Sequence, residues 1–383
     1  MGKIIHIVSQ TPALKNENSV AEVVIALATE EKSIGLDVAI WCIGQSLETE
    51  SSALAITIFP VHKNPFTISR SLKRALEKLP EDSIIHLHGA FAPVCFAISN
   101  YVRMSGKKIA IILSSHGAYG EHAWSRLSLL HKLYYYFFEK FVIKQARLVH
   151  LLGPLEAESY THTNKATPFI CLVDGTAGRL DNAPPSDFDG AKDPFVVACS
   201  SGAGLLGDEL EGVLRTFSRF KDEVYTTVEL WLVDEAADSK KTRQLADSLG
   251  VNKYIKFKKA STGQQRETVL TQSHVFAYPG RLEYTRSPVL DAASRGVPLI
   301  VNDETSLGAF VKRYQAGWTL TENNPDDLLR VLHEAYVIYK TDQETYTTLH
   351  RNSHRMVREE LNPSSLALKW KEIYDSLHTR RPN

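Results

Sequence analysis

Short apolar runs alternate with helical periods along nearly the whole chain, and this alternation limits the possible folds more than any other feature. In the first half the apolar runs lie at residues 4–9, 38–43, 84–88, 109–114, 148–152 and 169–173, separated by helical periods such as 20–32 and 68–79. Apolar strands joined by helices are typical of parallel sheets that are covered on both faces. We therefore expect an α/β fold.

The alternation stops near residue 178 and resumes near residue 194. Residues 178–193 contain two adjacent prolines and four aspartates with few side chains to bury, which is typical of an interdomain linker. Apolar runs then follow at residues 195–199, 228–233, 254–257, 274–278, 299–301 and 318–320. A chain of 383 residues also exceeds what one core usually supports. We expect two Rossmann-like, doubly wound domains that face each other across a cleft, at residues 1–177 and 194–363.

Charge and cysteine content argue against several classes of protein. Lysine plus arginine and aspartate plus glutamate both number 44, so there is no global basic field to attract a nucleic acid. The four cysteines stand apart, in or beside apolar runs, as expected for buried thiols in a reducing compartment. The first apolar run is too short for a signal peptide, and no later run reaches the roughly 18 residues of a membrane span. These features predict a soluble cytoplasmic protein.

Residues 275–301 are the strongest candidate for a ligand site. A short apolar strand and a Pro-Gly turn lead into a loop and then a helix, for which Ser287 is a suitable N-cap and Pro288 a suitable first residue. Glu283 on the loop and Asp291 on the helix are eight residues apart and flank free N–H groups that attract anions. Carboxylates accept hydroxyl groups and a helix N-terminus accepts phosphate, so this combination favours a nucleotide sugar.

These residues are similar to those of a known family. Glu283 and Asp291-Ala292, followed by Gly296-Val297-Pro298, resemble the E-x7-E and Gly-x-Pro patterns of the retaining, nucleotide-sugar-dependent glycosyltransferases of family four, in their bacterial form, with aspartate as the second acid. Ser114-Ser115-His116-Gly117 resembles the family's Thr-x-His-Gly strand end. The resemblance implies the GT-B fold, with a C-terminal helix at residues 364–383 that crosses back onto the N-terminal domain.

The resemblance also implies roles for single residues. Glu283 would contact the donor sugar, and Asp291 would contact the ribose hydroxyl groups. His116 would hydrogen-bond the donor sugar as a neutral ring, and we group it with Glu283 as catalytic. By position, Lys258 and Lys259 resemble the loop whose backbone reads the nucleobase.

Two loops depart from the family pattern. Residues 18–19 replace a Gly-Gly pair that approaches the diphosphate, and the 200–204 loop lacks the arginine and the following lysine that clamp it. Because a diphosphate needs counter-charge or many N–H donors, we expect two nearby arginines and the loop amides to substitute. The further donor-binding residues expected on this basis are Asn18, Ser19, Ser201, Gly202, Arg281, Arg286 and Ser287.

The resemblance implies an enzyme that needs no metal or other cofactor. It would transfer a hexose, by default glucose from UDP-glucose or another UDP-hexose, to a glycan or lipid-linked glycan in polysaccharide biosynthesis, with retention of configuration. Two alternatives remain open, because two Rossmann-like domains do not fix the chemistry. One is a nucleotide-sugar epimerase, and the other is a catalytically weak subunit that binds a nucleotide sugar and partners an active transferase.

Two further segments carry chemistry. His86 and His88 share one face of a strand, a spacing that can bind a metal, but that strand offers no carboxylate or cysteine beside them, so we expect no metal site. Residues 124–145, from Trp124 to Gln145, are predicted to form one aromatic and basic helix. Such a helix can pack in a core or rest on an anionic membrane. Since members of the family use lipid-linked acceptors, a peripheral contact with the inner face of the membrane is a further hypothesis.

Overall fold

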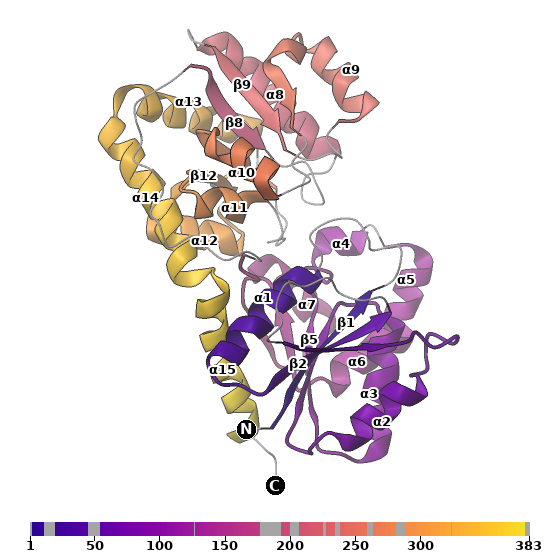
Figure 1. Cartoon of the computed structure of the whole chain (residues 1–383). Helices are drawn as coiled ribbons and strands as arrows, with labels where there is room; N and C mark the ends of the chain where they lie inside the picture. Colours follow the sequence, from indigo (N-terminus) through magenta and orange to yellow (C-terminus); the bar gives the residue numbers. More distant parts are fainter. Residues whose placement is uncertain are drawn as a thin grey trace. The chain divides into compact units, whose positions relative to one another are not determined.

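The chain forms two compact units, each built on one parallel sheet. The first unit comprises Met1–Arg179 and Asn362–Asn383, and the second comprises Leu180–Leu361. The computed structural model describes residues 2–10, 20–44, 54–125, 127–176, 193–199, 207–224, 227–233, 238–258, 263–280, 288–322 and 324–379. Figure 1 shows the sheet and helices of each unit.

The first unit contains a seven-stranded sheet in the order β3-β2-β1-β4-β5-β6-β7, with every neighbouring pair parallel. The order reverses between β1 and β4, and open α/β sheets bind ligands at the carboxyl ends of strands beside such a reversal. The strands are β1 (Ile4–Gln10), β2 (Val38–Gly44), β3 (Ala55–Phe59), β4 (Ile84–His88), β5 (Ala110–Ser114), β6 (Leu148–Leu151) and β7 (Phe169–Cys171). The helices are α1 (Val20–Ser33), α2 (Arg70–Lys78), α3 (Pro93–Ser105), α4 (Glu121–Ser125), α5 (Leu129–Tyr134), the π-helical η2 (Tyr135–Glu139), α6 (Lys140–Gln145), α7 (Pro154–Thr163) and α15 (Pro363–Thr379).

Alternate residues of β1 supply the two faces of this sheet. Ile5 and Ile7 join the apolar cluster that includes side chains of α2, α3 and α6. Ile4 and Val8 point to the opposite face and join the cluster that includes side chains of α1 and α15. Because side chains along a strand alternate between faces, His6 shares that second face with Ile4 and Val8. A polar side chain therefore lies in the middle of an apolar layer.

The C-terminal helix α15 covers part of this second face. Its buried side chains Leu366, Trp370 and Tyr374 pack in the same cluster as α1. The Tyr374 hydroxyl also donates a 2.9 Å hydrogen bond to Glu31 of α1, which is fully buried. Residues more than 340 positions apart in the sequence thus build one layer of the first unit.

The second unit contains a six-stranded parallel sheet in the order β10-β9-β8-β11-β12-β13. The strands are β8 (Phe195–Cys199), β9 (Val228–Leu232), β10 (Ile255–Phe257), β11 (Val275–Tyr278), β12 (Leu299–Asn302) and β13 (Gly317–Leu320). The helices are α8 (Gly207–Glu223), α9 (Lys240–Ser248), the 3-10 helix η4 (Asn252–Tyr254), α10 (Gly263–Thr271), α11 (Pro288–Ser294), α12 (Ser306–Tyr314), α13 (Pro325–Thr341) and α14 (Gln343–Glu360).

The predicted α/β fold with two Rossmann-like sheets is confirmed, with three local corrections. Strand β3 was not predicted, since it is an edge strand whose side chains are mostly exposed. Residues 124–145 do not form one helix: α4 ends at Ser125, and a new helical stretch begins at Leu129 because the Ser128 side chain caps it by accepting from the His131 amide. Cys171 is exposed, whereas the other three cysteines are buried as expected.

Candidate functional site

Most residues of the predicted donor site lie outside the part of the chain that the structure describes. Three predicted residues are described: His116 in the first unit, and Lys258 and Asp291 in the second. The predicted residues outside the described ranges are Asn18, Ser19, Ser201, Gly202, Lys259, Arg281, Glu283, Arg286 and Ser287.

Asp291 lies in the first turn of α11, beyond the carboxyl end of β11. The helix begins at Pro288, as predicted from the sequence. The backbone carbonyl of Asp291 accepts hydrogen bonds from Ser294 Oγ at 2.8 Å and from Arg295 Nη1 at 2.9 Å. Since these bonds involve the backbone, they fix the last turn of a short helix without involving the Asp291 carboxylate.

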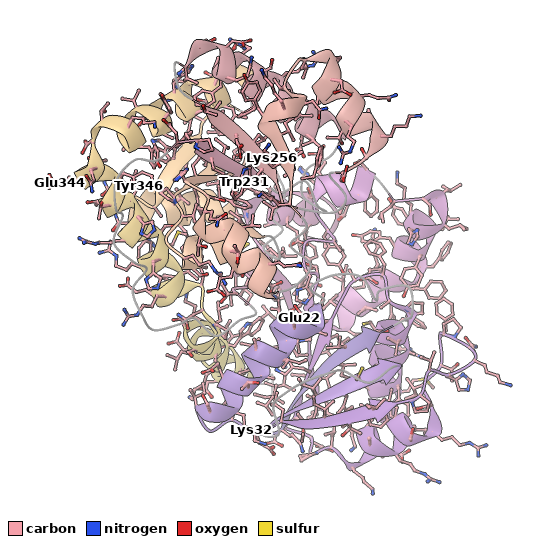
Figure 2. The ribbon with its side chains drawn as sticks, turned by 45° about the horizontal axis from the view of Figure 1, so that its top comes forward. Glu22, Lys32, Trp231, Lys256, Glu344 and Tyr346 are labelled. Atoms are coloured by element: carbon pink, nitrogen blue, oxygen red, sulfur yellow. The ribbon has the colours of Figure 1, made fainter. Side chains whose placement is uncertain are left out.

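Lys258 follows β10 and stacks on an aromatic ring of the neighbouring strand. Its Nζ lies 3.9 Å from the centroid of the Trp231 ring, which is within the range of a cation–π contact. Its backbone amide donates to the Leu232 carbonyl at 2.8 Å. Trp231 is paired in register with Lys256 of β10, and both are labelled in Figure 2. The Lys258 charge is therefore held over the carboxyl end of this sheet edge.

His116 lies two residues beyond the end of β5 and has a left-handed backbone, with φ of 51°. Its Nδ1 lies 2.6 Å from Asp174 Oδ2, and its Nε2 lies 3.0 Å from His88 Nδ1. Both ring nitrogens are thus hydrogen-bonded within the first unit, and only 8% of the residue is exposed. Left-handed backbone is costly for a residue with a side chain and is often found at functional sites. A sugar hydroxyl that binds a nitrogen of this ring has to replace one of these two partners.

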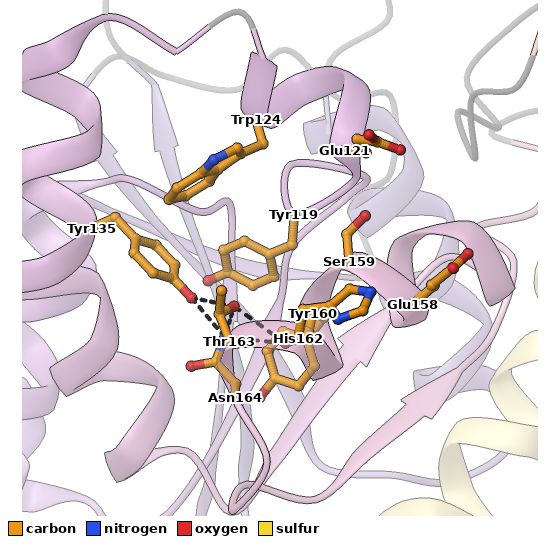
Figure 3. A pocket seen from close by; sticks show the side chains of 10 residues that line it. All are labelled: Tyr119, Glu121, Trp124, Tyr135, Glu158, Ser159, Tyr160, His162, Thr163 and Asn164. Carbon is orange, nitrogen blue, oxygen red and sulfur yellow. Dashed lines mark hydrogen bonds between the residues drawn. The ribbon is translucent and has the colours of Figure 1, made fainter.

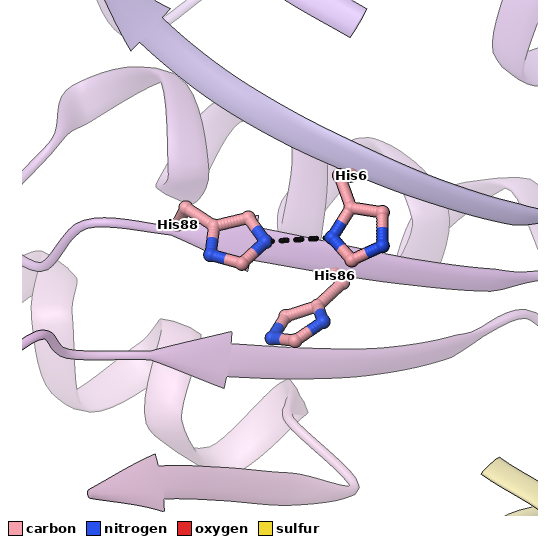
Figure 4. Close-up of side chains that lie close together, drawn as sticks. All are labelled: His6, His86 and His88. Carbon is pink, nitrogen blue, oxygen red and sulfur yellow. Dashed lines mark hydrogen bonds between the residues drawn. The ribbon is translucent and has the colours of Figure 1, made fainter. Parts of the chain in front are cut away.

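The hydrogen bonds continue from His88 into the interior. His88 Nε2 lies 2.8 Å from His6 Nδ1 (Figure 4). His6 Nε2 lies 2.7 Å from Glu31 Oε2. All these groups are buried. Glu31, His6 and Asp174 were not predicted from the sequence. The only signal was the pair His86 and His88 on one strand face.

A second series of hydrogen bonds runs beside the first, through His86 and His150. His86 Nδ1 lies 3.2 Å from the Tyr374 hydroxyl, and its Nε2 lies 2.7 Å from Ser114 Oγ. Ser114 Oγ lies 2.8 Å from His150 Nδ1, and His150 Nε2 donates to the Leu172 carbonyl at 2.6 Å. Burial lowers the pKa of His86 and of His88 well below the usual value, and nearby imidazoles lower each pKa further.

His6, His86 and His88 form a candidate metal site, because one nitrogen of each lies within 4.8 Å of the others. All six ring nitrogens have a hydrogen-bond partner. Two imidazole ligands of one tetrahedral zinc ion have their nitrogens about 3.3 Å apart. His6 Nδ1 and His88 Nε2 are 2.8 Å apart, a hydrogen-bond distance. As arranged, the three rings form a hydrogen-bonded network that offers no open set of metal ligands.

A pocket of about 410 Å³ lies in the first unit between α4, η2 and α7, and sequence reasoning did not predict it (Figure 3). Tyr135 and Asn164 are joined across one wall, since the Asn164 amide donates to the Tyr135 hydroxyl at 2.7 Å. Four aromatic residues and six polar residues line the pocket: Tyr119, Trp124, Tyr135 and Tyr160, with Glu121, Glu158, Ser159, His162, Thr163 and Asn164. Such a mixture of aromatic walls with a few polar groups is typical of small-molecule sites.

Buried carboxyl groups hold the loop between β5 and this pocket. Glu156 of α7 accepts from Ser115 Oγ at 2.7 Å, from the Tyr119 amide at 3.0 Å and from the Leu152 amide at 2.8 Å. Glu139 accepts a 2.5 Å hydrogen bond from the Tyr119 hydroxyl. Burial raises the pKa of Glu156, and it raises the pKa of Glu139 to about 7. The backbone after β5 is therefore fixed on both sides of His116.

Part of the chain matches a known family by sequence. Residues 190–352 match the sequence model of a family described as glycosyl transferases group 1. This range covers most of the second unit and includes α11 and Lys258. Among curated proteins, none matches the sequence significantly.

Solved structures match over nearly the whole chain. The catalytic domain of starch synthase IV from Arabidopsis thaliana, bound to ADP and acarbose, is 14% identical, with a TM-score of 0.70 over 99% of this chain and 100% of that one. Anabaena Alr3699/HepE in complex with UDP and glucose is 12% identical, with a TM-score of 0.68 over 98% and 100% of the two chains. A protein from Listeria monocytogenes assigned as a UDP-N-acetylglucosamine 2-epimerase is 12% identical, with a TM-score of 0.52 over 100% and 97%. The chain therefore has the GT-B fold, and its second unit carries a segment that matches the group 1 glycosyl transferases.

Proposed function

We propose that the protein is a retaining glycosyltransferase that moves a hexose from a nucleoside diphosphate sugar to a glycan or lipid-linked glycan. The observation that carries this proposal is the match of residues 190–352 to the group 1 glycosyl transferases, on a chain with the GT-B fold. Two neighbours in fold hold UDP or ADP together with a sugar, which supports a nucleotide-sugar donor. UDP-glucose is the default donor, with a role in polysaccharide biosynthesis.

The donor is proposed to bind the second unit where β11 leads into α11. Asp291 lies in the first turn of α11, where it can accept ribose hydroxyl groups. Glu283 is proposed to contact the sugar, and Arg281 or Arg286 to neutralise the diphosphate. A helix N-terminus and guanidinium groups are the usual partners of phosphate oxygens.

In the proposed reaction, the bond between the sugar C1 and the leaving phosphate oxygen breaks while a bond forms from C1 to the acceptor oxygen on the same face. The proton of the acceptor hydroxyl passes to the leaving phosphate oxygen, so atoms and charge balance without a protein nucleophile. Arg286 and the Ser287 helix end would stabilise the charge that develops on the diphosphate. No metal or other cofactor takes part, so turnover is expected to persist in the presence of a chelator.

The aromatic pocket of the first unit is proposed to bind the acceptor. Its rings from Tyr119, Trp124 and Tyr160 can cover the apolar faces of a sugar, and its carboxylates and hydroxyls can bind sugar hydroxyl groups. The loop that carries His116 also carries Tyr119, so donor contact and acceptor contact would share one rigid loop.

The helical surface formed by α5 and η2 is proposed to rest on the inner face of an anionic membrane. Leu129, Leu130 and Phe137 are 73%, 77% and 70% exposed, an unusual density of exposed apolar side chains. Lys132 and Lys140 lie in the same stretch and can pair with lipid phosphates. Within the described residues, no helix has the length and apolar character needed to cross a bilayer.

Co-sedimentation with anionic liposomes tests this membrane contact. The double substitution Leu129→Ser and Leu130→Ser is expected to release the protein from liposomes that retain the wild type at low salt. Val337→Ser removes a similarly exposed apolar side chain from α13 of the second unit and serves as the control. Equal retention of all three proteins, or no binding by the wild type, would remove the membrane contact from the proposal.

A thermal-shift screen of nucleoside diphosphates and their sugars, followed by turnover of the isolated chain, tests the proposed activity. A nucleotide that binds only the folded state raises the melting temperature. Asp291→Ala is expected to reduce that shift, and Glu283→Ala to reduce turnover. Glu334→Ala, an exposed carboxylate on α13 of the same unit, is the matched control. Wild-type turnover in Glu283→Ala would overturn the site assignment.

Two other functions have some support. The epimerase has a specific observation in its favour, the Listeria neighbour, but its TM-score of 0.52 is lower than the 0.70 of the starch synthase. Product analysis separates the two, since an epimerase returns a nucleotide sugar and a transferase releases a nucleoside diphosphate. A catalytically weak binding subunit is favoured by the missing cationic clamp in the 200–204 loop. Turnover by the isolated chain would exclude it.

A further inference from the structure

Five buried side chains of the first unit form a continuous series of hydrogen bonds, here called the histidine chain. It runs from Glu31 through His6, His88 and His116 to Asp174, with heavy-atom separations of 2.7, 2.8, 3.0 and 2.6 Å. None of the five residues is more than 8% exposed. The series begins at Glu31 on α1 and ends at Asp174, three residues beyond β7, next to His116, which we propose contacts the donor sugar.

The histidine chain contains one more hydrogen bond than its groups can supply in their ordinary ionisation states. Each of its four bonds needs one hydrogen between the two heavy atoms. Three neutral imidazoles carry one N–H each, and two ionised carboxylates carry none, which gives three hydrogens for four bonds. Since a buried polar group without a partner is costly, the complete set of bonds requires one additional proton.

The additional proton is most stable at the two ends of the histidine chain, next to Glu31 and next to Asp174. Burial lowers the pKa of His88, the central ring, well below the usual value, so this ring stays neutral. His6 and His116 each lie at hydrogen-bond distance from a carboxylate, a group that becomes a donor when it takes up a proton. The proton can therefore reside on the Glu31–His6 pair or on the His116–Asp174 pair.

We propose that the histidine chain is a proton relay that holds one mobile proton and passes it between the Glu31–His6 pair and the His116–Asp174 pair. In one state Glu31 is protonated and donates to His6 Nε2, and every ring carries its hydrogen on Nδ1. When each hydrogen moves across its own bond, Glu31 becomes a carboxylate, every ring carries its hydrogen on Nε2, and Asp174 is protonated. The same number of atoms and charges is present before and after.

The groups that surround the histidine chain fit this assignment. Tyr374 of α15 donates to Glu31 Oε1 in both states, because the relay uses only Oε2. Glu156 of α7 is the nearby buried carboxyl that interacts electrostatically with His116. The parallel series through His86, Ser114 and His150 ends on the Leu172 carbonyl, which cannot release a proton, so that series cannot relay in both directions.

The relay lets the His116 ring change which of its nitrogens donates a hydrogen bond. This part of the inference rests on the proposed function. When a sugar hydroxyl replaces Asp174 or His88 as a partner of His116, it can accept from the ring or donate to it, so the ring can be needed in either tautomer. A relay allows that change by moving the proton toward Glu31, without leaving an unpaired charge in the interior. His88, His6 and Glu31 would then be positioning residues for His116.

Nitrogen-15 NMR of histidine-labelled full-length protein tests the relay without any substrate. In Glu31→Gln the amide can still accept from Tyr374 and can donate to His6 Nε2, so all three rings are expected to carry their hydrogen on Nδ1. In Asp174→Asn the amide donates to His116 Nδ1, so all three rings are expected to carry it on Nε2. In the wild type, the ring nitrogens are expected to show shifts between those of the two variants. Both substitutions are isosteric, and if one variant fails to fold, the other still reports the position of the ring hydrogens.

The decisive observation is the response of the ring at the far end. Asp174→Asn has to shift the nitrogen resonances of His6, and Glu31→Gln has to shift those of His116. Glu223→Gln calibrates a purely local effect, since Glu223 pairs with His333 at 2.7 Å in an isolated pair of the second unit. If each substitution changes only the adjacent ring, as Glu223→Gln is expected to do, the relay is overturned.

A transfer assay over a range of pH separates this inference from the proposed function. With a working relay, Glu31→Gln is expected to change the pH profile of transfer although Glu31 lies in the interior, far along the chain from His116. If Glu31→Gln leaves the pH profile of transfer unchanged while the nitrogen resonances at the far end still shift, the relay exists in the protein without substrate, and its positioning role in transfer is overturned. Absence of transfer in the wild type with far-end shifts intact would overturn the proposed function and leave the relay standing.

Discussion

His116 combines a left-handed backbone with a ring whose two nitrogens are both hydrogen-bonded inside the first unit. Gly117, with φ of 85°, continues the same tight turn. Such a turn is stable only where its surroundings fix it, and Glu156 does so by accepting from Ser115 and from the Tyr119 amide. The turn after β5 is therefore rigid, and a ligand can bind the His116 ring only by replacing one of its two hydrogen-bond partners.

Gly296 is a second position where a single residue determines the local structure. Its φ is 84°, and a Cβ added there would lie 2.6 Å from Cε1 of the His350 ring on α14. We expect Gly296→Ala to lower the free energy of unfolding by about 1–3 kcal/mol, through strain and through displacement of that ring. Gly212→Ala in α8, where nothing lies within 4 Å, is the control and is expected to be neutral or stabilising. Urea unfolding measures both, and equal stability of the two variants would contradict the steric reason.

The ionisation of Glu139 is expected to make the stability of the protein depend on pH. Burial raises its pKa to about 7 in the folded protein, above the usual value of 4.5. The folded state then holds a proton that the unfolded state has released, so stability is lost as pH rises from 4.5 through 7, by about 3 kcal/mol in total. Glu139→Gln, which stays neutral, should lack this loss. Urea unfolding at pH 5 and pH 8 checks the prediction, and parallel behaviour of both proteins would show that Glu139 ionises freely when folded.

At the scale of elements, strands buried on both faces could be predicted from the sequence. An exposed edge strand and contacts between residues far apart in the sequence could not. Strands such as β8 and β11 are continuous apolar runs, and all of their residues are buried. Edge strand β3 escaped prediction because only Phe59 is fully buried. The histidine chain also escaped, since its members come from α1, three strand regions and the end of the first unit's sheet. Sequence spacing revealed that His86 and His88 share a face, but it does not reveal which strands become neighbours.

The helix α15 gives an element-scale prediction. Trp370 is 3% exposed and packs against the His86 ring, with ring centroids 4.6 Å apart. We expect Trp370→Ala to cost about 3–5 kcal/mol of stability, because it leaves a large cavity next to buried polar groups. Leu368→Ala on the same helix removes a side chain of which 55% is exposed, and it should cost far less. Thermal unfolding compares the two, and a similar loss in both would mean that α15 contributes helix propensity rather than packing.

At the scale of the whole molecule, buried imidazoles are concentrated in the first unit. Burial lowers the pKa of His86, His88 and His150 there, whereas in the described part of the second unit only His354, which is less deeply buried, shows a lowered pKa. A base with a lowered pKa in the folded state stays neutral while the unfolded chain takes up protons. Stability is therefore lost as pH falls below about 6.5, by about 1.4 kcal/mol per pH unit for each such ring.

The two units should therefore respond differently to acid. The raised pKa values of Glu139 and Glu156 in the first unit oppose the loss, Glu139 by about 1.4 kcal/mol per pH unit between pH 7 and 4.5, but three imidazoles outweigh two carboxyl groups. Hydrogen exchange followed by mass spectrometry reports each unit from its own peptides, after correction for the intrinsic effect of pH. Between pH 7 and pH 5 we expect peptides from β4 and β6 to lose protection by more than those from β11 and β12. A greater loss of protection in peptides of the second unit would contradict this prediction. It would indicate that the buried imidazoles of the first unit take up protons while that unit stays folded.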